Sequence, residues 1–275
     1  MILIKFLERK IQRKLHGLIY KHINIYRFTL IVYRYMNFFN LLPPHEEDIY
    51  GLKYLNLNEK DDFIDVGASD GVFFKGVKSI GIKNKFIAFE PISAKHFLSK
   101  VKKKNKNFKY YDIALGNRTG TLTLYMPNYN DWRLYNWSSY SKNNVINHLK
   151  FHNFNINLEK MNFKKYKVKQ RKLDSFKLKP TFIKIDVEGY ENKVLLGAMK
   201  TIKKYKPAIY VENNLLKGKY NTVNFFKKKL LKFGYKPYIF KFEKKSFLKF
   251  NEKYFTRKRF LHNVFFITKK HFIIN

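Results

Sequence analysis

Residues 182–191 read Phe182-Ile183-Lys184-Ile185-Asp186-Val187-Glu188-Gly189-Tyr190-Glu191, a largely apolar run followed at once by three carboxylates and a glycine. Acidic residues are scarce in this chain, 20 Asp and Glu in 275 positions, so three of them within six residues stand out. Open α/β sheets bind ligands outside the carboxyl ends of their strands. The stretch therefore predicts a buried strand that carries acidic side chains into an active site.

A similar pattern lies upstream, at residues 63–71, which read Phe-Ile-Asp-Val-Gly-Ala-Ser-Asp-Gly. Gly67 and Gly71 follow this apolar strand and precede a predicted helix, and Glu90 closes the next apolar run, 86–90. Glycines let the backbone approach a ligand closely, and a helix N-terminus offers unpaired N–H groups. A carboxylate at Glu90 can accept both hydroxyls of an adenosine ribose. The arrangement predicts a nucleotide-cofactor site.

The spacing of this first motif favours S-adenosylmethionine over a dinucleotide. A dinucleotide fingerprint has the pattern G-x-G-x-x-G, whereas here Ser69 takes the place of the second glycine and Asp65 ends the strand. An anion at Asp65 suits an aminoacyl ammonium and a sulfonium better than a pyrophosphate. Asp112, after the third predicted strand, could meet the adenine edge. The alternative is a plain tight turn with Glu90 as an ordinary surface acid.

The composition is strongly basic, with a formal net charge of +37. Such a charge ordinarily indicates a polyanionic partner, either nucleic acid or an anionic membrane. The excess is nearly all Lys and comes with many Asn, Ile, Phe and Tyr residues, which is typical of A/T-rich codon usage, so we do not expect nucleic acid as the partner. The chain has no cysteine, which excludes a disulfide framework, a zinc–thiolate site and a cysteine nucleophile.

Residues 1–45 form a predicted basic helical extension, because apolar residues recur there at spacings of three and four: Ile4, Leu7, Ile11, Leu15 and Leu18. This helix either packs on the main domain or on a second subunit of a homo-oligomer, or lies on a membrane surface. No run reaches the roughly 20 apolar residues of a spanning helix, and the N-terminus lacks a clean signal-peptide core. We expect a cytoplasmic protein, with peripheral contact at the inner membrane surface as the alternative.

From residue 46 to 275 the chain alternates strand and helix patterns, which predicts one α/β domain with a parallel sheet covered by helices. A long excursion, about 120–175, separates the third and fourth core strands. Within it 120–125 alternates like an exposed strand, whereas 130–155 fits neither helix nor strand. A helix is expected at 221–233. The expected strands are 62–66, 86–90, 108–114, 182–187 and 207–212, with closing strands at 238–240 and 263–267.

Several further motifs follow in a fixed order: Ala88-Phe89-Glu90-Pro91, Ala114-Leu115-Gly116-Asn117 with Gly120, Leu173-Asp174, and Val194-Leu195-Leu196-Gly197-Ala198. Together with 63–71, 183–191 and 207–212 they resemble the FkbM-type methyltransferases that depend on S-adenosylmethionine. The resemblance covers about 60–215, but not 1–45 or the Asn-rich part of the excursion. The usual glycine-asparagine turn is here Ala68-Ser69-Asp70.

This resemblance implies a class I, Rossmann-like fold with a doubly wound, mostly parallel seven-stranded sheet. It also implies methyl transfer to a hydroxyl of a sugar, a polysaccharide or a secondary metabolite. We expect the cofactor, S-adenosylmethionine, to contact Asp65, Gly67, Ser69, Asp70, Gly71, Glu90, Asp112, Ile113 and Ala114.

Methyl transfer to an alcohol requires collinear donor and acceptor atoms, and the alcohol must lose its proton. A nearby carboxylate or His can supply about 10²–10⁴-fold as general base. We expect Asp186 or Glu188 in this role, with Glu212 as a neighbour and Lys184 on the same face. Alternatively, Glu188 and Glu191 cap the following helix and only Asp186 is functional. Second-choice bases are His148 and His152. Without a fuller ligand set we expect no metal.

Both tryptophans lie in the aromatic segment 131–140. Aromatic faces bordered by Asn and Ser suit stacking on sugar rings, so we expect Trp132, Tyr135, Trp137 and Ser138 to contact the acceptor; a packed surface flap is equally compatible.

The chief alternative function is an RNA ribose 2′-O-methyltransferase, or another nucleic-acid methyltransferase, using Asp186, Lys217 and a distal Glu. The Pro-Pro-aromatic turn typical of base methylation is absent after the fourth strand. A third reading is a non-catalytic module that binds S-adenosylmethionine or nothing.

Overall fold

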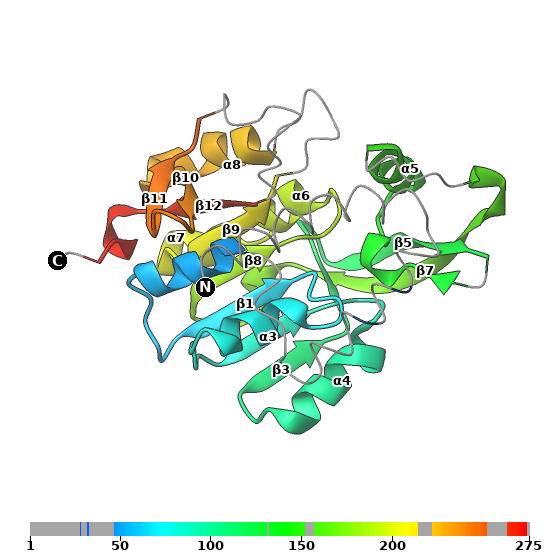
Figure 1. Cartoon of the computed structure of the whole chain (residues 1–275), viewed down its shortest axis with the longest axis horizontal. Helices are drawn as coiled ribbons and strands as arrows, with labels where there is room; N and C mark the ends of the chain where they lie inside the picture. The colour runs from blue at the N-terminus through cyan, green and yellow to red at the C-terminus, as the bar shows by residue number, and fades with distance from the viewer. Residues whose placement is uncertain are drawn as a thin grey trace.

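A computed structural model describes residues 28, 32, 47–130, 132–151, 157–213, 222–251 and 263–273. Figure 1 shows a large sheet with helices on both faces and a smaller sheet at one side of it. The predicted helical extension at 1–45 lies outside the described residues, apart from positions 28 and 32. No helix in the described part of the chain is long and apolar enough to cross a bilayer.

The large sheet has eight strands in the order β11-β10-β12-β9-β8-β1-β2-β3. Neighbouring strands from β3 to β9 pair in parallel, and the three pairs beyond β9 are antiparallel. The strand bounds are β1 Asp62–Val66, β2 Phe86–Phe89, β3 Phe108–Tyr111, β8 Pro180–Ile185, β9 Ala208–Glu212, β10 Lys236–Lys241, β11 Ser246–Lys249 and β12 Asn263–Ile267.

The predicted α/β class is confirmed, but the expected seven-stranded layout is wrong, because the sheet has eight strands and is mixed. The additional strand is β11, which forms a hairpin with β10 at the edge of the sheet. Phe247 explains why this segment pairs. Its ring packs edge-on against Phe240 and Phe265, with centroids 5.2 Å apart in both pairs, so apolar contact holds the extra strand in place.

Helices cover the two faces of the sheet in two separate apolar layers. The first layer contains η1 (Glu47–Tyr54), α3 (Val72–Ser79) and α4 (Ala94–Lys104), packed on alternate strand residues such as Phe63 and Phe182. The second contains α6 (Glu191–Leu196), α7 (Met199–Tyr205) and α8 (Thr222–Leu230), packed on the intervening residues such as Ile64 and Ile183. The central strands are buried on both sides, as expected for a doubly wound sheet.

The strand order reverses between β1 and β8. From β1 the chain winds outward through β2 to β3, and from β8 it winds the other way to β9. The helices that follow these two strands, α3 and α6, lie on opposite faces. Such a switch point opens a crevice beyond the carboxyl ends of the two strands, and ligands bind there in sheets of this kind.

The excursion forms a second, four-stranded sheet in the order β4-β7-β5-β6, seen on the right of Figure 1. The predicted strand at 120–125 is confirmed as part of β5. Residues 130–155, which the sequence left without an assignment, contain β6 and α5 in their described part. The bounds are β4 Ala114–Leu115, β5 Gly120–Tyr129, β6 Trp132–Arg133, β7 Met161–Arg171, α5 Lys142–Phe151, and the short 3₁₀ helices η2 Tyr135–Trp137, η3 Leu158–Lys160, η4 Leu173–Ser175, η6 Leu231–Phe233 and η8 Lys269–His271.

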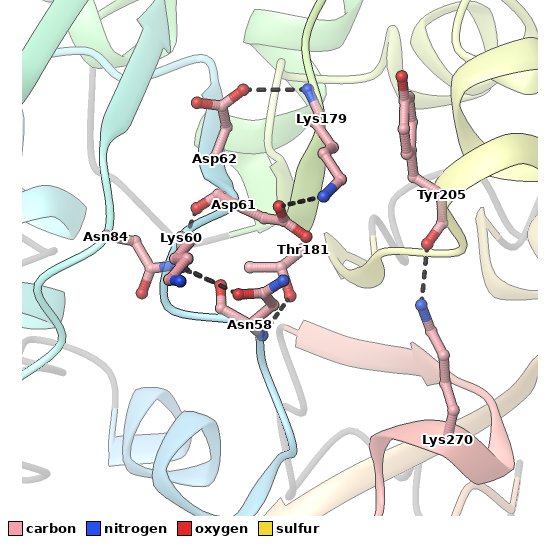
Figure 2. Close-up of polar contacts among 9 residues, drawn as sticks. All are labelled: Asn58, Lys60, Asp61, Asp62, Asn84, Lys179, Thr181, Tyr205 and Lys270. Atoms are coloured by element: carbon pink, nitrogen blue, oxygen red, sulfur yellow. Dashed lines mark hydrogen bonds and ion pairs between the residues drawn. The ribbon is translucent and has the colours of Figure 1, made fainter.

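The amino-terminal edge of the large sheet is closed by hydrogen bonds, as Figure 2 shows. Asn84 Nδ2 donates to the carbonyl oxygens of Asn58 and Asp61, at 2.8 and 2.9 Å. The Lys179 N–H donates to Asp62 Oδ2 at 3.0 Å. These contacts tie together the chain segments that enter β1, β2 and β8.

We expect Asn84→Ala to lower the free energy of unfolding by about 1–3 kcal/mol, because Asn84 is only 9% exposed and two carbonyls would lose their donor. Urea denaturation measures the loss. As a control, Lys179→Met removes an ion pair to Asp61 whose lysine side chain is 62% exposed, and we expect a change below about 1 kcal/mol. Equal losses in the two variants would contradict this account of the edge.

Candidate functional site

The acidic residues predicted from sequence come together along the carboxyl edge of the sheet. Asp65 of β1 lies opposite Lys184 of β8, and Lys184 lies opposite Tyr210 of β9. The same register, continued for two more residues, sets Asp186 between Gly67 and Glu212. A bond from Asp186 N to Val66 O at 3.0 Å confirms that the register continues past the strand end. Since neighbouring strands lie about 4.8 Å apart, the predicted cofactor and catalytic residues share one edge.

The turn after β1 depends on glycine. Gly67 has φ 84°, and a Cβ there would lie 1.7 Å from the backbone oxygen of Asp186. Gly71, which begins α3, has φ 80°. Ser69, in the place of a second glycine, also adopts a left-handed φ of 47°. The motif therefore brings the backbones after β1 and β8 into direct contact; Asp70 lies half-buried in the same turn.

Glu90 is not an ordinary surface acid. Its Oε2 accepts from Ser69 N at 3.1 Å, and its Oε1 accepts from Ile92 N at 2.9 Å and from Ser93 N at 3.1 Å. The carboxylate joins the turns that follow β1 and β2, so it is held in a defined place at the sheet edge. A carboxylate oxygen can accept two hydrogen bonds, and Oε2 keeps capacity for a ligand hydroxyl. Its contact with a ribose stays a prediction.

Lys184 lies between two carboxylates. Its Nζ is 2.9 Å from Asp186 Oδ2, 3.6 Å from Asp65 Oδ1 and 5.4 Å from the centre of the Phe73 ring. Lys184 is 5% exposed and Asp65 is fully buried. Neither oxygen of Asp65 accepts a hydrogen bond from any residue that the structure describes. Asp65 thus has the Lys184 ammonium nearby but no hydrogen-bond donor within 3.5 Å among the described residues, which is rare for a buried acceptor. It fits a further cationic or hydrogen-donating ligand, so the residues present suit the ammonium of S-adenosylmethionine.

The pKa of Asp65 is raised to about 6: burial raises it most, the Lys184 ammonium lowers it, and the charges of Asp186 and Glu90 add smaller rises. The pKa of Glu188 is also raised, first by burial and then by Asp186 and Glu191. A crowded set of carboxylates with perturbed pKa values is typical of functional sites.

Glu191 is the first residue of α6, but its hydrogen bonds are to the turn before the helix. Its Oε1 accepts from Val187 N at 3.1 Å and from Gly189 N at 2.9 Å, and its side chain is buried. It therefore fixes the turn that presents Asp186 and Glu188. Glu188 itself has φ 54°, a strained value for a residue other than glycine, and strained backbone clusters at functional sites.

The expected acceptor residues are not equivalent. Trp137 is 7% exposed and packs with Leu134, Val145 and Leu149 in the core of the excursion, which favours the packed-flap reading for this ring. Trp132 is half-buried against the same cluster. The half-buried Tyr135 stacks on His96 and meets the edge of Phe97, with centroids 6.3 and 5.7 Å apart. The Ser138 hydroxyl donates to the Tyr135 carbonyl at 2.8 Å.

Two residues of this segment that sequence reasoning missed reach the predicted turns. Asn136 Oδ1 accepts from the Ser69 hydroxyl at 2.8 Å, and the Ser139 hydroxyl donates to the Glu188 carbonyl at 2.8 Å. Asn144, on α5, donates to the same carbonyl at 3.5 Å. The one sequence signal for these three residues was their position within or next to the aromatic segment 131–140.

The remaining expected residues lie at the margins. Asp112 is exposed after β3 and pairs with Lys95 of α4, Nζ to Oδ2 3.5 Å. Ile113 is half-buried, and Ala114 is buried at the start of β4. A bond from Glu90 N to Tyr111 O, 3.1 Å, places this segment beside Glu90. His152 lies outside the described residues, and the His148 side chain is not among those described.

The chain matches the family model described as the methyltransferase FkbM domain over residues 65–237, which include the residues predicted for cofactor and catalysis. Among solved structures, it is similar to the methyltransferase FkbM of Methylobacillus flagellatus KT, with 17% identity and a TM-score of 0.47 over 79% of this chain. This chain spans 47% of that protein, about half its length. A precorrin-6y C5,15-methyltransferase of Geobacter metallireducens GS-15 has 12% identity and a TM-score of 0.35, covering 78% of this chain and 82% of its own. No curated protein matches the chain.

We expect Asp65→Asn to stabilise the free protein above pH 6. The folded-state pKa of Asp65, about 6, lies above its ordinary value of 3.8, so the folded protein binds this proton more tightly. Its ionisation therefore lowers the free energy of unfolding as pH rises from about 4 to 6. Asn cannot ionise, so the variant should match the wild type at pH 4 and exceed it by up to about 3 kcal/mol at pH 8. Urea denaturation at both pH values measures this; a variant less stable at pH 8 would contradict it.

Proposed function

This chain belongs to the FkbM methyltransferase family, and we propose that it transfers a methyl group from S-adenosylmethionine to a hydroxyl of a sugar, a glycan or a related metabolite. The observation that carries the proposal is the acidic edge at the switch point. There a buried Asp65 without a hydrogen-bond donor lies beside a glycine turn, a fixed Glu90 and Asp186.

S-adenosylmethionine, when bound, supplies an activated methyl group on a cationic sulfonium. On the protein side, Asp65 offers a carboxylate for a cationic or donor group, and the Gly67 turn offers a backbone that no side chain shields. Glu90 offers a fixed acceptor for ribose hydroxyls. The charge sign supports this arrangement, since the carboxylates of Asp65 and Asp186 share the single ammonium of Lys184, and a bound cation offsets the excess of negative charge.

Asp186 is the better general base of the two candidates. Its Oδ2 is engaged by Lys184 at 2.9 Å, which leaves Oδ1 to accept the proton of an acceptor hydroxyl. Its side chain is 31% exposed, so the acceptor can reach it. Burial and the charges of Asp186 and Glu191 raise the pKa of Glu188, so Glu188 is the candidate that we assign to orienting the acceptor oxygen by a hydrogen bond. Glu212, on the next strand, is positioned to bind a second hydroxyl.

The first test is binding and transfer by the wild-type protein. We expect calorimetry to detect S-adenosylhomocysteine, and labelled S-adenosylmethionine to label a glycan fraction among glycan, lipid and RNA fractions of the source cell. A protein that binds neither nucleoside would leave only a non-catalytic role. Label confined to RNA, together with steeply salt-dependent RNA binding, would replace the proposed acceptor with nucleic acid.

We expect Asp186→Asn to lower methyl transfer by about 10²–10⁴-fold while S-adenosylhomocysteine binding changes less than about twofold. Asn keeps an oxygen that accepts from Lys184 but cannot take a proton. The matched control is Asp61→Asn at the opposite edge, where the carboxylate pairs with Lys179, and its transfer rate should equal that of the wild type. Full turnover by Asp186→Asn would remove the base assignment.

A further inference from the structure

One short segment of the excursion spans the carboxyl edge of the large sheet. This strap, residues 135–139, bonds at one end to the turn after β1, through Asn136 and Ser69. At its other end it bonds to the turn after β8, through Ser139 and Glu188. The strap therefore touches both the predicted donor side and the predicted acceptor side of the site.

The strap is fixed at both ends by further contacts. At its start, the Tyr135 ring lies parallel to His96 with an interplanar angle of 10° and nearly perpendicular to Phe97 at 89°. Both partners belong to α4, the helix that follows the Glu90 turn. At its end, Ser139 exchanges two backbone hydrogen bonds with Tyr125 of β5, at 2.7 and 3.1 Å. The position of Asn136 is thus set by α4 and by the second sheet.

Ser69 links the strap to Glu90. Its hydroxyl donates to Asn136 Oδ1 at 2.8 Å, and its N–H donates to Glu90 Oε2 at 3.1 Å. Its carbonyl accepts from the Ser93 hydroxyl at 3.0 Å. Ser69 adopts a left-handed φ of 47°, which costs a residue with a Cβ about 1–2 kcal/mol. Bonds at all three polar groups of Ser69 stabilise this conformation and aim its N–H at Glu90.

We propose that Asn136, acting through Ser69, is a positioning residue for Glu90, so that the excursion takes part in holding the donor ribose. This inference rests on the proposed function, because it assigns Glu90 to the cofactor. The strap would then couple the binding of the two substrates. Contacts that hold the strap against the acceptor side of the site also fix the Ser69 turn on the donor side.

The chemistry of Asn136 gives a sharp comparison of variants. Its Oδ1 is the acceptor for Ser69, so Asn136→Asp keeps an acceptor whereas Asn136→Leu removes it. Asn128 is the matched control, because its Nδ2 donates to Asn162 Oδ1 at 3.0 Å within the same excursion, away from the turn. Losing one solvent-accessible hydrogen bond has a similar effect on folding at both positions, so the unfolding midpoints of Asn136→Leu and Asn128→Leu should agree.

We expect calorimetry to show S-adenosylhomocysteine binding about three- to tenfold weaker for Asn136→Leu than for the wild type. Asn136→Asp and Asn128→Leu should bind like the wild type. In the background of Glu90→Gln, Asn136→Leu should add less than about a twofold loss, because the two residues act as one unit. Wild-type affinity in Asn136→Leu, or independent additive losses, would overturn the inference.

A second measurement needs no ligand. The Ser69 N–H donates to Glu90, so amide hydrogen exchange of the turn 67–71 in the free protein should be faster in Asn136→Leu than in the wild type and Asn128→Leu. Equal exchange in all three would overturn the inference. If exchange is faster only in Asn136→Leu but the wild-type protein binds no S-adenosylhomocysteine, the inference about the turn holds and the proposed function is refuted. The two failures are therefore distinguishable.

Discussion

The buried ammonium of Lys184, shared between Asp65 and Asp186, is the constraint on which the site depends. Taking charged groups out of water is costly, and removal of the Lys184 ammonium would leave two carboxylates without their shared cation, at a cost of about 3–5 kcal/mol. The contacts at 3.6 and 2.9 Å require β1 and β8 to be neighbours in one register, since a slip of one residue would turn Asp65 and Lys184 to opposite faces. The same register brings Gly67 against Asp186. Electrostatics and the glycine turn therefore specify the same strand pairing.

The strands and helices that hydrophobic patterns mark clearly were predicted from the sequence. The bounds of β1 agree with the prediction and those of β8 differ from it by two residues at each end; both are short, largely apolar segments. The helix expected at 221–233 is confirmed over its described residues by α8 and η6, and Val223, Phe226 and Leu230 of α8 are fully buried. In contrast, β7 was missed although Lys165, Lys167 and Lys169 alternate with Tyr166, Val168 and Gln170, because few of its residues are apolar. The strand β11 was missed because its pairing depends on the distant ring of Phe265.

For the site too, local sequence patterns did not reveal contacts between residues that are distant in the chain. The proximity of residues at the strand ends could be predicted from the chain alone, because strand ends meet at one edge. The contact between Ser69 and Asn136 joins positions 67 residues apart, and no local pattern marks either as a partner of the other. For Trp137 the sequence left a sugar platform and a packed flap equally open, and its ring lies in the excursion core, which favours the packed flap. In the excursion, burial decides which aromatic rings remain accessible.

The close approach of the Gly67 backbone to the Asp186 carbonyl has a practical consequence for protein engineering. A Cβ at position 67 would overlap a main-chain atom rather than a movable side chain, so no rotamer change elsewhere can accommodate it. Mutant libraries that aim to alter acceptor range should keep this position invariant and place their diversity on the surface of the second sheet, where neighbouring side chains can adapt.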